Sequence, residues 1–140
     1  MKIIKIIRDN DFGLNIPDPQ THEERSAARE IVFDSEKRVA LLHATKKSYH
    51  KLPGGGIEEG EDTETALKRE LLEEIGCLVE NIRELGIIEE YRNDLKLHQV
   101  SYCFIADLVG EKGETNLEEG EIADGFEPEW MSLSDATRTL

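Results

Sequence analysis

Positive charge is scarce in this chain of 140 residues, and no long apolar run occurs in it. Lysine and arginine together number 17 against 31 aspartates and glutamates, which leaves a formal net charge of −14. A nucleic-acid backbone or an anionic membrane surface would be repelled by such a chain, so we expect no stable binding to either. A small polyanionic substrate stays compatible if metal ions neutralise the site locally.

Cysteine is also rare. Cys77 and Cys103 are the only two, and they form neither a CxxC pair nor a metal-binding spacing. This usage favours two reduced, packed thiols in a cytoplasmic protein. In residues 1–8 short apolar pairs alternate with basic residues, which argues against a signal peptide or a membrane span and predicts a strand. An irregular connection is expected over residues 9–24.

The chain has no repeat, no low-complexity tract and no linker, and its length is typical of one domain covering residues 1–140. Apolar and β-branched patterns predict strands at residues 27–33, 38–43, 79–90, 97–109 and 127–131. A loop is expected over residues 110–125, and a last helix is expected from Ser132 or Ser134. Strands around one long helix, with a second helix at the end, indicate an α+β fold.

One predicted helix carries three carboxylates on a single stripe. Glu70, Glu73 and Glu74 are spaced i, i+3 and i+4, so their side chains gather on one side. The neighbouring arc is apolar and holds Leu67, Leu71 and Ile75. Like charges at this spacing repel by roughly 0.2–0.5 kcal/mol per pair, and a divalent cation would reverse that repulsion. Oxygen ligands favour Mg²⁺ or Mn²⁺ over zinc, and we see no Cys/His cluster in the sequence to compete. Considered alone, the three glutamates are better explained by a solvated acidic face.

A glycine-rich turn at residues 53–56 precedes this helix. Glycine allows positive φ angles and a close approach between the backbone and another group. The helix is expected to begin near Asp62 or Thr63, which can cap free N–H groups, and to end at Gly76. A glycine turn by itself is unspecific. In combination with the acidic helix it predicts a site for a metal ion and a phosphate chain.

The combined segment resembles the Nudix box, GX5EX7REUXEEXGU, in which U is an apolar residue. The match spans residues 55–77, and every fixed position is present: Gly55, Glu61, Arg69, Glu70, Leu71, Glu73, Glu74 and Gly76. Cys77 fills the last apolar position as a small hydrophobic residue. Residues 52–55 and Trp130 also resemble the family pattern. The resemblance implies the Nudix fold, an α/β/α sandwich around a mixed β-sheet.

The resemblance implies a metal-dependent hydrolase of phosphoric anhydride bonds. Such an enzyme cleaves a nucleoside diphosphate linked to another moiety, and water attacks a phosphorus atom. Mg²⁺ or Mn²⁺ is the expected cofactor. Glu70, Glu73 and Glu74 are expected to hold the metal, with the carbonyl of Gly54 as a further ligand.

Catalytic roles are expected for two of these glutamates, Glu73 and Glu74, together with Arg69. The arginine is expected to orient the carboxylates through charge-assisted hydrogen bonds. Gly55 and Glu61 are expected to support the turn and the start of the helix. Glu61 can also contribute to the metal shell.

The general base stays open between a box glutamate and a distant loop. Glu118, Glu119 and Glu121 are the loop candidates, although a solvated acidic loop explains each of them equally well. His50 and His98 titrate near neutrality, but lone histidines beside strands are more often structural, and we assign them no catalytic role.

The substrate is expected to be a nucleotide-type small molecule, with a nucleoside triphosphate of the MutT type as the leading expectation. The stretch after the box lacks the proline typical of ADP-ribose enzymes, and Tyr91 falls slightly early for the tyrosine of dinucleoside polyphosphate enzymes. Tyr49 and Tyr91 can stack on a base or simply pack on strands. The alternatives are a dinucleoside polyphosphate or NDP-sugar hydrolase, a non-catalytic nucleotide sensor and a prenyl diphosphate isomerase. The resemblance also allows a homodimer.

Overall fold

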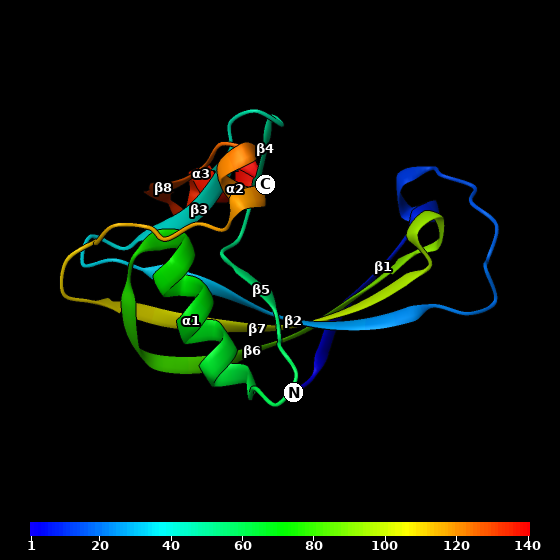
Figure 1. The fold of residues 1–140 in the computed structure, drawn as a ribbon, viewed down its shortest axis with the longest axis horizontal. Helices are drawn as coiled ribbons and strands as arrows, with labels where there is room; N and C mark the ends of the chain where they lie inside the picture. The colour runs from blue at the N-terminus through cyan, green and yellow to red at the C-terminus, as the bar shows by residue number, and fades with distance from the viewer.

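Eight strands form one mixed sheet in the computed structural model, which describes all residues from 1 to 140 (Figure 1). The strands are β1 (Ile3–Arg8), β2 (Glu23–Phe33), β3 (Arg38–Ala44), β4 (Tyr49–Lys51), β5 (Gly54–Gly56), β6 (Leu78–Arg92), β7 (Leu97–Val109) and β8 (Phe126–Ser132). The main order is β1-β6-β7-β2-β3-β4, while β5 pairs with β2 and β8 pairs with β3. The β1–β6 and β2–β7 pairs are parallel and the other pairs are antiparallel, so the expected mixed sheet is confirmed.

Three helices accompany the sheet, and the two longer ones lie on opposite faces. They are α1 (Thr63–Ile75), α2 (Glu119–Ala123) and α3 (Leu133–Thr139), with short 3-10 turns η1 (Asp9–Phe12) and η2 (Asn93–Leu95). Side chains of β3 alternate between the two faces because successive residues of a strand point in opposite directions. Ala40 and Leu42 pack into the core with α1, whereas Val39 and Leu41 pack with Ala136 of α3. The predicted α+β class and α/β/α sandwich are therefore confirmed.

The ends of α1 lie where the sequence predicts them. The Asp62 side chain accepts a hydrogen bond from Thr65 N at 2.7 Å and caps the first turn. Gly76 ends the helix in the left-handed conformation, with φ of 66°. A Cβ at Gly76 would also lie 2.5 Å from the carbonyl oxygen of Gly113. Two constraints therefore favour glycine at this position: the positive φ angle of the turn, and the close approach of the Gly113 segment to the end of the helix.

The structure differs from the sequence-based expectations in several segments, one of which is the short strand β4, which was not predicted. Strand β2 begins at Glu23 rather than at Ala27, because its polar first residues pair in parallel with β7 without any apolar signal. The glycine turn contains the short strand β5, which pairs with β2. The expected loop over residues 110–125 contains α2, whose five residues are too few to show helical periodicity.

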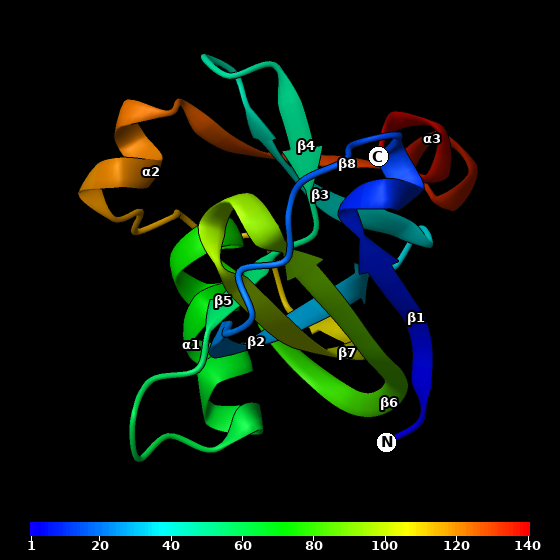
Figure 2. The ribbon, with the colours of Figure 1, turned by 90° about the vertical axis from the view of Figure 1, so that its right-hand side faces the viewer.

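Strand β1, the second half of β6, the first half of β7 and the first half of β2 extend away from the helices as an arm (Figure 1), which Figure 2 shows end-on. The 3-10 turns η1 and η2 lie at the tip of this arm. Both cysteines, Cys77 and Cys103, are buried and free, as predicted. None of the helices has the length and apolar character needed to cross a membrane.

One core position of β2 carries an unpaired acid. Glu30 has no exposed surface, and neither of its carboxyl oxygens has a hydrogen-bond partner. It lies on the same face of β2 as Ala28 and Val32, which pack against α1. Burial raises the pKa of Glu30 from 4.5 to about 8, because the charged form loses its hydration. The folded protein therefore holds a proton there at neutral pH.

This proton makes stability depend on pH. Because the pKa of Glu30 is higher in the folded state, the contribution of Glu30 to the free energy of unfolding is fully present below pH 4.5 and is lost as pH rises through about 8. Between pH 5.5 and 8.5 the free energy of unfolding of the wild type should decrease. We expect this decrease to be smaller by on the order of 2–3 kcal/mol in Glu30→Gln. Urea unfolding at both pH values measures this. The matched control is Glu84→Gln at an exposed strand position, which should leave the loss unchanged. An equal loss in wild type and Glu30→Gln would contradict the assignment.

Candidate active site

Glu74 joins the acidic helix α1 to the glycine strand β5. Its side chain is 1% exposed, and Gly54 N donates a hydrogen bond to Oε1 at 2.7 Å. The other oxygen, Oε2, lies 3.6 Å from Lys51 Nζ and has no hydrogen-bond partner. One oxygen of Glu74 therefore holds the strand in place and the other is left unsatisfied.

The protein surroundings alone do not favour a charged Glu74. Burial raises its pKa to about 8, and the neighbouring carboxyl of Glu121 adds to the rise, while Lys51 and the Gly54 N–H oppose it. Buried unpartnered oxygens cost free energy unless a further group satisfies them. A cation at this point would satisfy the free oxygen and stabilise the charged carboxylate.

Glu70 lies directly against the glycine strand. A Cβ at Gly55 would be 2.7 Å from the carboxyl group of Glu70, so a larger residue here would force that carboxyl to move. Burial raises the pKa of Glu70, and the hydrogen bond from Arg69 Nη1 to its Oε1, at 2.9 Å, partly offsets the rise. The role expected for Gly55 thus has a steric basis in the structure.

Arg69 connects the acidic residues around it. Its Nε and Nη2 donate a bidentate pair of hydrogen bonds to Glu61, at 2.8 and 2.9 Å. Its Nη2 also donates to the carbonyl of Gly56 at 3.3 Å, and its Nη1 lies 3.5 Å from Glu73 Oε2. The bonds from Arg69 lower the pKa of Glu61 to about 2. Arg69 therefore ties the segment before the helix to the acidic face.

Glu73 faces the segment that follows β7. Its side chain is 25% exposed, and its backbone carbonyl accepts a hydrogen bond from Asn116 N at 2.7 Å. Burial raises the pKa of Glu73; Arg69 opposes this, while Glu118 and Glu121 add to it. The long segment is thus fastened to the helix beside the acidic cluster.

Two of the three loop glutamates reach this cluster. Glu118 caps the N-terminus of α2, and Glu121 accepts a hydrogen bond from Glu118 N at 3.0 Å. Both residues line the cleft beside α1, whereas Glu119 does not. Because only Glu121 contributes to the raised pKa of all three box glutamates, it is the loop carboxyl that faces the whole cluster.

The acidic cluster forms one side of a cleft of about 490 Å³. Its remaining charged side chains are the basic Arg25, Arg29 and Lys51, from β2 and β4, and the acidic Asp124, which directly follows α2. The only apolar residues of the lining are Ala123 and Phe126. Sequence analysis did not identify these basic residues because they lie outside the box. The signal for Arg25 and Arg29 was their even spacing, which places them on one face of a strand.

The backbone of Gly54 is unusual. Its φ angle is 131°, and a Cβ there would lie 2.0 Å from the carbonyl oxygen of Ala28. Its carbonyl, the expected metal ligand, accepts a hydrogen bond from Arg29 Nη1 at 2.8 Å. The carbonyl lies at the cleft and keeps a second lone pair for another partner.

The donor set of the cluster is made of oxygen atoms alone. Two of these oxygens are buried without a hydrogen-bond partner, Oε2 of Glu73 and Oε2 of Glu74. Hard divalent cations such as Mg²⁺ prefer such carboxylate and carbonyl oxygens. The residues present therefore fit a divalent metal ion of the kind that the sequence predicts.

Several polar side chains singled out in the sequence lie elsewhere. Tyr91 stacks on His98 on the arm, at 4.3 Å between ring centroids, and neither residue lines the cleft. His50 lies with His43 and Glu129 in a cluster suited to metal binding. The sequence analysis did not foresee this cluster. The three residues come from three strands, so sequence spacing could not reveal them.

Comparison with known proteins agrees with this architecture. The NUDIX domain model matches residues 23–140. The chain is 30% identical over 128 residues to diphosphoinositol polyphosphate phosphohydrolase 3-alpha of Mus musculus, with 88% of this chain and 72% of that protein covered. It is 36% identical over 107 residues to the ADP-ribose pyrophosphatase of Methanocaldococcus jannaschii, with 74% and 60% covered.

A solved structure of a Nudix hydrolase from Nitrosomonas europaea has the same fold. Its TM-score is 0.69 at 17% identity, and the match covers 84% of this chain and 78% of that one. The region matched by the family model contains the acidic helix, the glycine strand and the cleft. The chain therefore belongs to the Nudix family and is a hydrolase of phosphoric anhydride bonds.

Proposed function

We propose that this protein is a metal-dependent pyrophosphohydrolase that cleaves a nucleoside triphosphate into a nucleoside monophosphate and pyrophosphate. The observation that carries the proposal is the buried Glu74 carboxyl, whose free oxygen faces a cleft with acids on one side and basic residues on the other. Such a cleft suits a phosphate chain held between metal ions and cationic side chains.

Glu70, Glu73 and Glu74 hold the metal in this proposal, with the Gly54 carbonyl as a further ligand. A bound Mg²⁺ or Mn²⁺ neutralises phosphate charge and lowers the pKa of a water ligand. Arg69 orients the carboxylates of Glu70 and Glu73 through the contacts described above. Its bidentate pair with Glu61 keeps the arginine in place.

Glu121 accepts the proton of the attacking water. One of its oxygens is engaged by Glu118 N, and the residue lines the cleft beside Glu74. Glu118 shares the cleft but serves as the cap of α2, and Glu119 lies outside the cleft.

The choice of a mononucleotide rests on the lining of the cleft. Phe126 is its one aromatic residue and provides a single stacking surface for a base. Tyr91 lies on the arm, outside the cleft, which argues against the use of this tyrosine for a dinucleoside polyphosphate. One base surface beside a strongly polar cleft fits a single nucleoside with a phosphate chain.

A second candidate substrate is an inositol polyphosphate that carries a diphosphate group. The mouse relative is named for that activity, and its match covers most of this chain. The cleft has only two apolar residues in its lining, which also suits a substrate rich in phosphate.

The first test is a chromatographic product screen with Mg²⁺ or Mn²⁺, repeated with EDTA. The panel contains standard and oxidised nucleoside triphosphates, dinucleoside polyphosphates, NDP-sugars, ADP-ribose and a diphosphoinositol polyphosphate. We expect metal-dependent release of a nucleoside monophosphate from a triphosphate. Glu74→Gln should lower kcat by about 10²–10³-fold, because a ligand of the stabilising charge is lost. The variant should fold, since glutamine resembles the protonated acid. Full activity of a folded Glu74→Gln would overturn the assignment.

Glu121→Gln tests the general base. We expect kcat to fall by about 10²–10⁴-fold, with the acidic limb of the pH–rate profile lost, because the proton acceptor is removed. Glu119→Gln is the matched control, because Glu119 also belongs to α2, two residues before Glu121. The kcat of this variant should stay near that of the wild type. Equal losses in the two variants would point to a structural role of α2 instead.

Lys51→Met tests the cationic side of the cleft. Loss of one charged contact to phosphate, worth about 1.5–3 kcal/mol, should raise KM by about tenfold or more. Lys47→Met is the control, since Lys47 is exposed in the turn before β4 and lies outside the cleft. Steady-state kinetics on the best substrate of the screen separates the two outcomes. A KM for Lys51→Met equal to that of the control would remove Lys51 from the binding site.

A further inference from the structure

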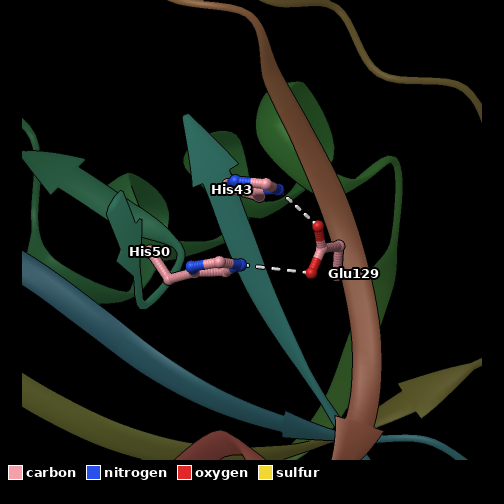
Figure 3. A group of neighbouring side chains, drawn as sticks. All are labelled: His43, His50 and Glu129. Atoms are coloured by element: carbon pink, nitrogen blue, oxygen red, sulfur yellow. Dashed lines mark hydrogen bonds and ion pairs between the residues drawn. The ribbon is translucent and has the colours of Figure 1, made fainter. Parts of the chain in front are cut away.

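A second cluster of metal-ligand side chains lies on the sheet face opposite to α1 (Figure 3). His43 belongs to β3, His50 to β4 and Glu129 to β8. On β3, His43 lies on the same face as Leu41, which packs with Ala136 of α3, and on the face opposite to Leu42. The cluster is thus separated from the acidic cleft by the sheet itself.

The three side chains converge on one point. His43 Nδ1 lies 2.6 Å from Glu129 Oε1, and His50 Nε2 lies 3.2 Å from Glu129 Oε2. The two imidazole rings stack at 4.1 Å between centroids with 11° between their planes. Figure 3 shows both ring nitrogens directed at the same carboxylate. One potential ligand atom from each residue falls within 4.8 Å of the others.

The cluster is only partly buried, and its carboxylate is ready to bind a cation. The exposed fractions are 27% for His43, 19% for His50 and 34% for Glu129. Burial acts to raise the pKa of Glu129, but hydrogen bonds from His50 and His43 outweigh it and hold that pKa below its ordinary value. An ion can therefore enter from solvent and keep a water molecule as an additional ligand.

We propose that His43, His50 and Glu129 bind a zinc ion. Two imidazole nitrogens with one carboxylate oxygen form a donor set that suits zinc, whereas the oxygen-only cluster of α1 suits Mg²⁺ or Mn²⁺. In a tetrahedral site with bonds of about 2.1 Å, ligand atoms lie roughly 3.3 Å apart, which resembles the present spacing. The ion replaces the hydrogen bonds to Glu129, and the stacked rings turn so that their nitrogens converge.

The bound ion fastens the edge strand β4 to β8 across β3. Strand β4 has only three residues, and His50 is followed by Lys51, whose Nζ lies 3.6 Å from Glu74 in the cleft. His43 pairs with His50 across β3 and β4, while Glu129 pairs with Leu41 across β8 and β3. The zinc site therefore stabilises the strand that presents Lys51.

Titration of the metal-free protein with Co²⁺, in excess Mg²⁺ to fill the oxygen-only cluster, tests the proposal. Co²⁺ substitutes for zinc, and we expect one equivalent to give the intense visible absorption of a tetrahedral site, displaced by Zn²⁺. His50→Asn and Glu129→Gln should each weaken binding at least tenfold. His98→Asn is the matched control, because His98 pairs with Glu89 on the arm, and it should bind like the wild type.

Thermal unfolding gives a second readout that does not depend on activity. Zinc at about a hundredfold excess over its Kd should raise Tm by about 5–10 °C in the wild type and in Glu74→Gln, but not in His50→Asn. If zinc still raises the Tm of Glu74→Gln, the zinc site is distinct from the proposed catalytic site. Absence of saturable Co²⁺ absorption, or an unchanged spectrum in both His50→Asn and Glu129→Gln, would overturn the zinc site. The His–Glu cluster would then be a hydrogen-bond network only.

Discussion

The buried hydrogen bond between Glu74 and the backbone of Gly54 holds the acidic helix against the glycine strand. Gly54 N and Glu74 Oε1 are 2.7 Å apart. This contact places α1 over β5, close enough for the side chain of Glu70 to lie against Gly55. A Cβ at Gly54 would collide with the backbone of Ala28 in β2, and a Cβ at Gly55 would force the carboxyl of Glu70 to move. The positions of the other carboxylates in the cluster follow from this one approach.

Charge is unevenly divided around that contact. Arg69 is the cation within the acidic cluster, and much of its bonding capacity is directed at Glu61. Burial is the largest cause of the raised pKa values of Glu70, Glu73 and Glu74. An arrangement of this kind is unfavourable without a cation and favourable with one, as is common at functional sites. Arg69 stabilises the scaffold, and in the proposed function a metal ion would complete the site.

Two buried carboxyls illustrate different relations between stability and function. Glu74 has an unsatisfied oxygen that faces the cleft, and a ligand can compensate for the cost of its burial. Glu30 lies among core residues of β2 with both oxygens unsatisfied and does not line the cleft. Nothing in the proposed mechanism uses Glu30. Its burial therefore only lowers the free energy of unfolding, at pH values at which an exposed glutamate would be deprotonated.

Much of the local structure was predictable because it rests on short-range interactions. The limits of α1 follow from the cap at Asp62 and the left-handed turn at Gly76, and the mixed sandwich was expected from the resemblance carried by the box. Strand β5 and helix α2 were not predicted, since three glycines and a five-residue helix leave no periodic pattern. Strand β2 was predicted too short because pairing with β7, rather than its own sequence, extends it to Glu23.

The sequence by itself determined that the chain forms an acidic helix after a glycine turn, because both depend on residues within a few turns of one another. Only the tertiary structure decided which of the loop glutamates faces that helix and which basic residues line the cleft opposite it. It also brought His43, His50 and Glu129 together from three strands. These groupings depend on strand order and register, and contacts between residues distant in sequence leave no fixed spacing in a single chain.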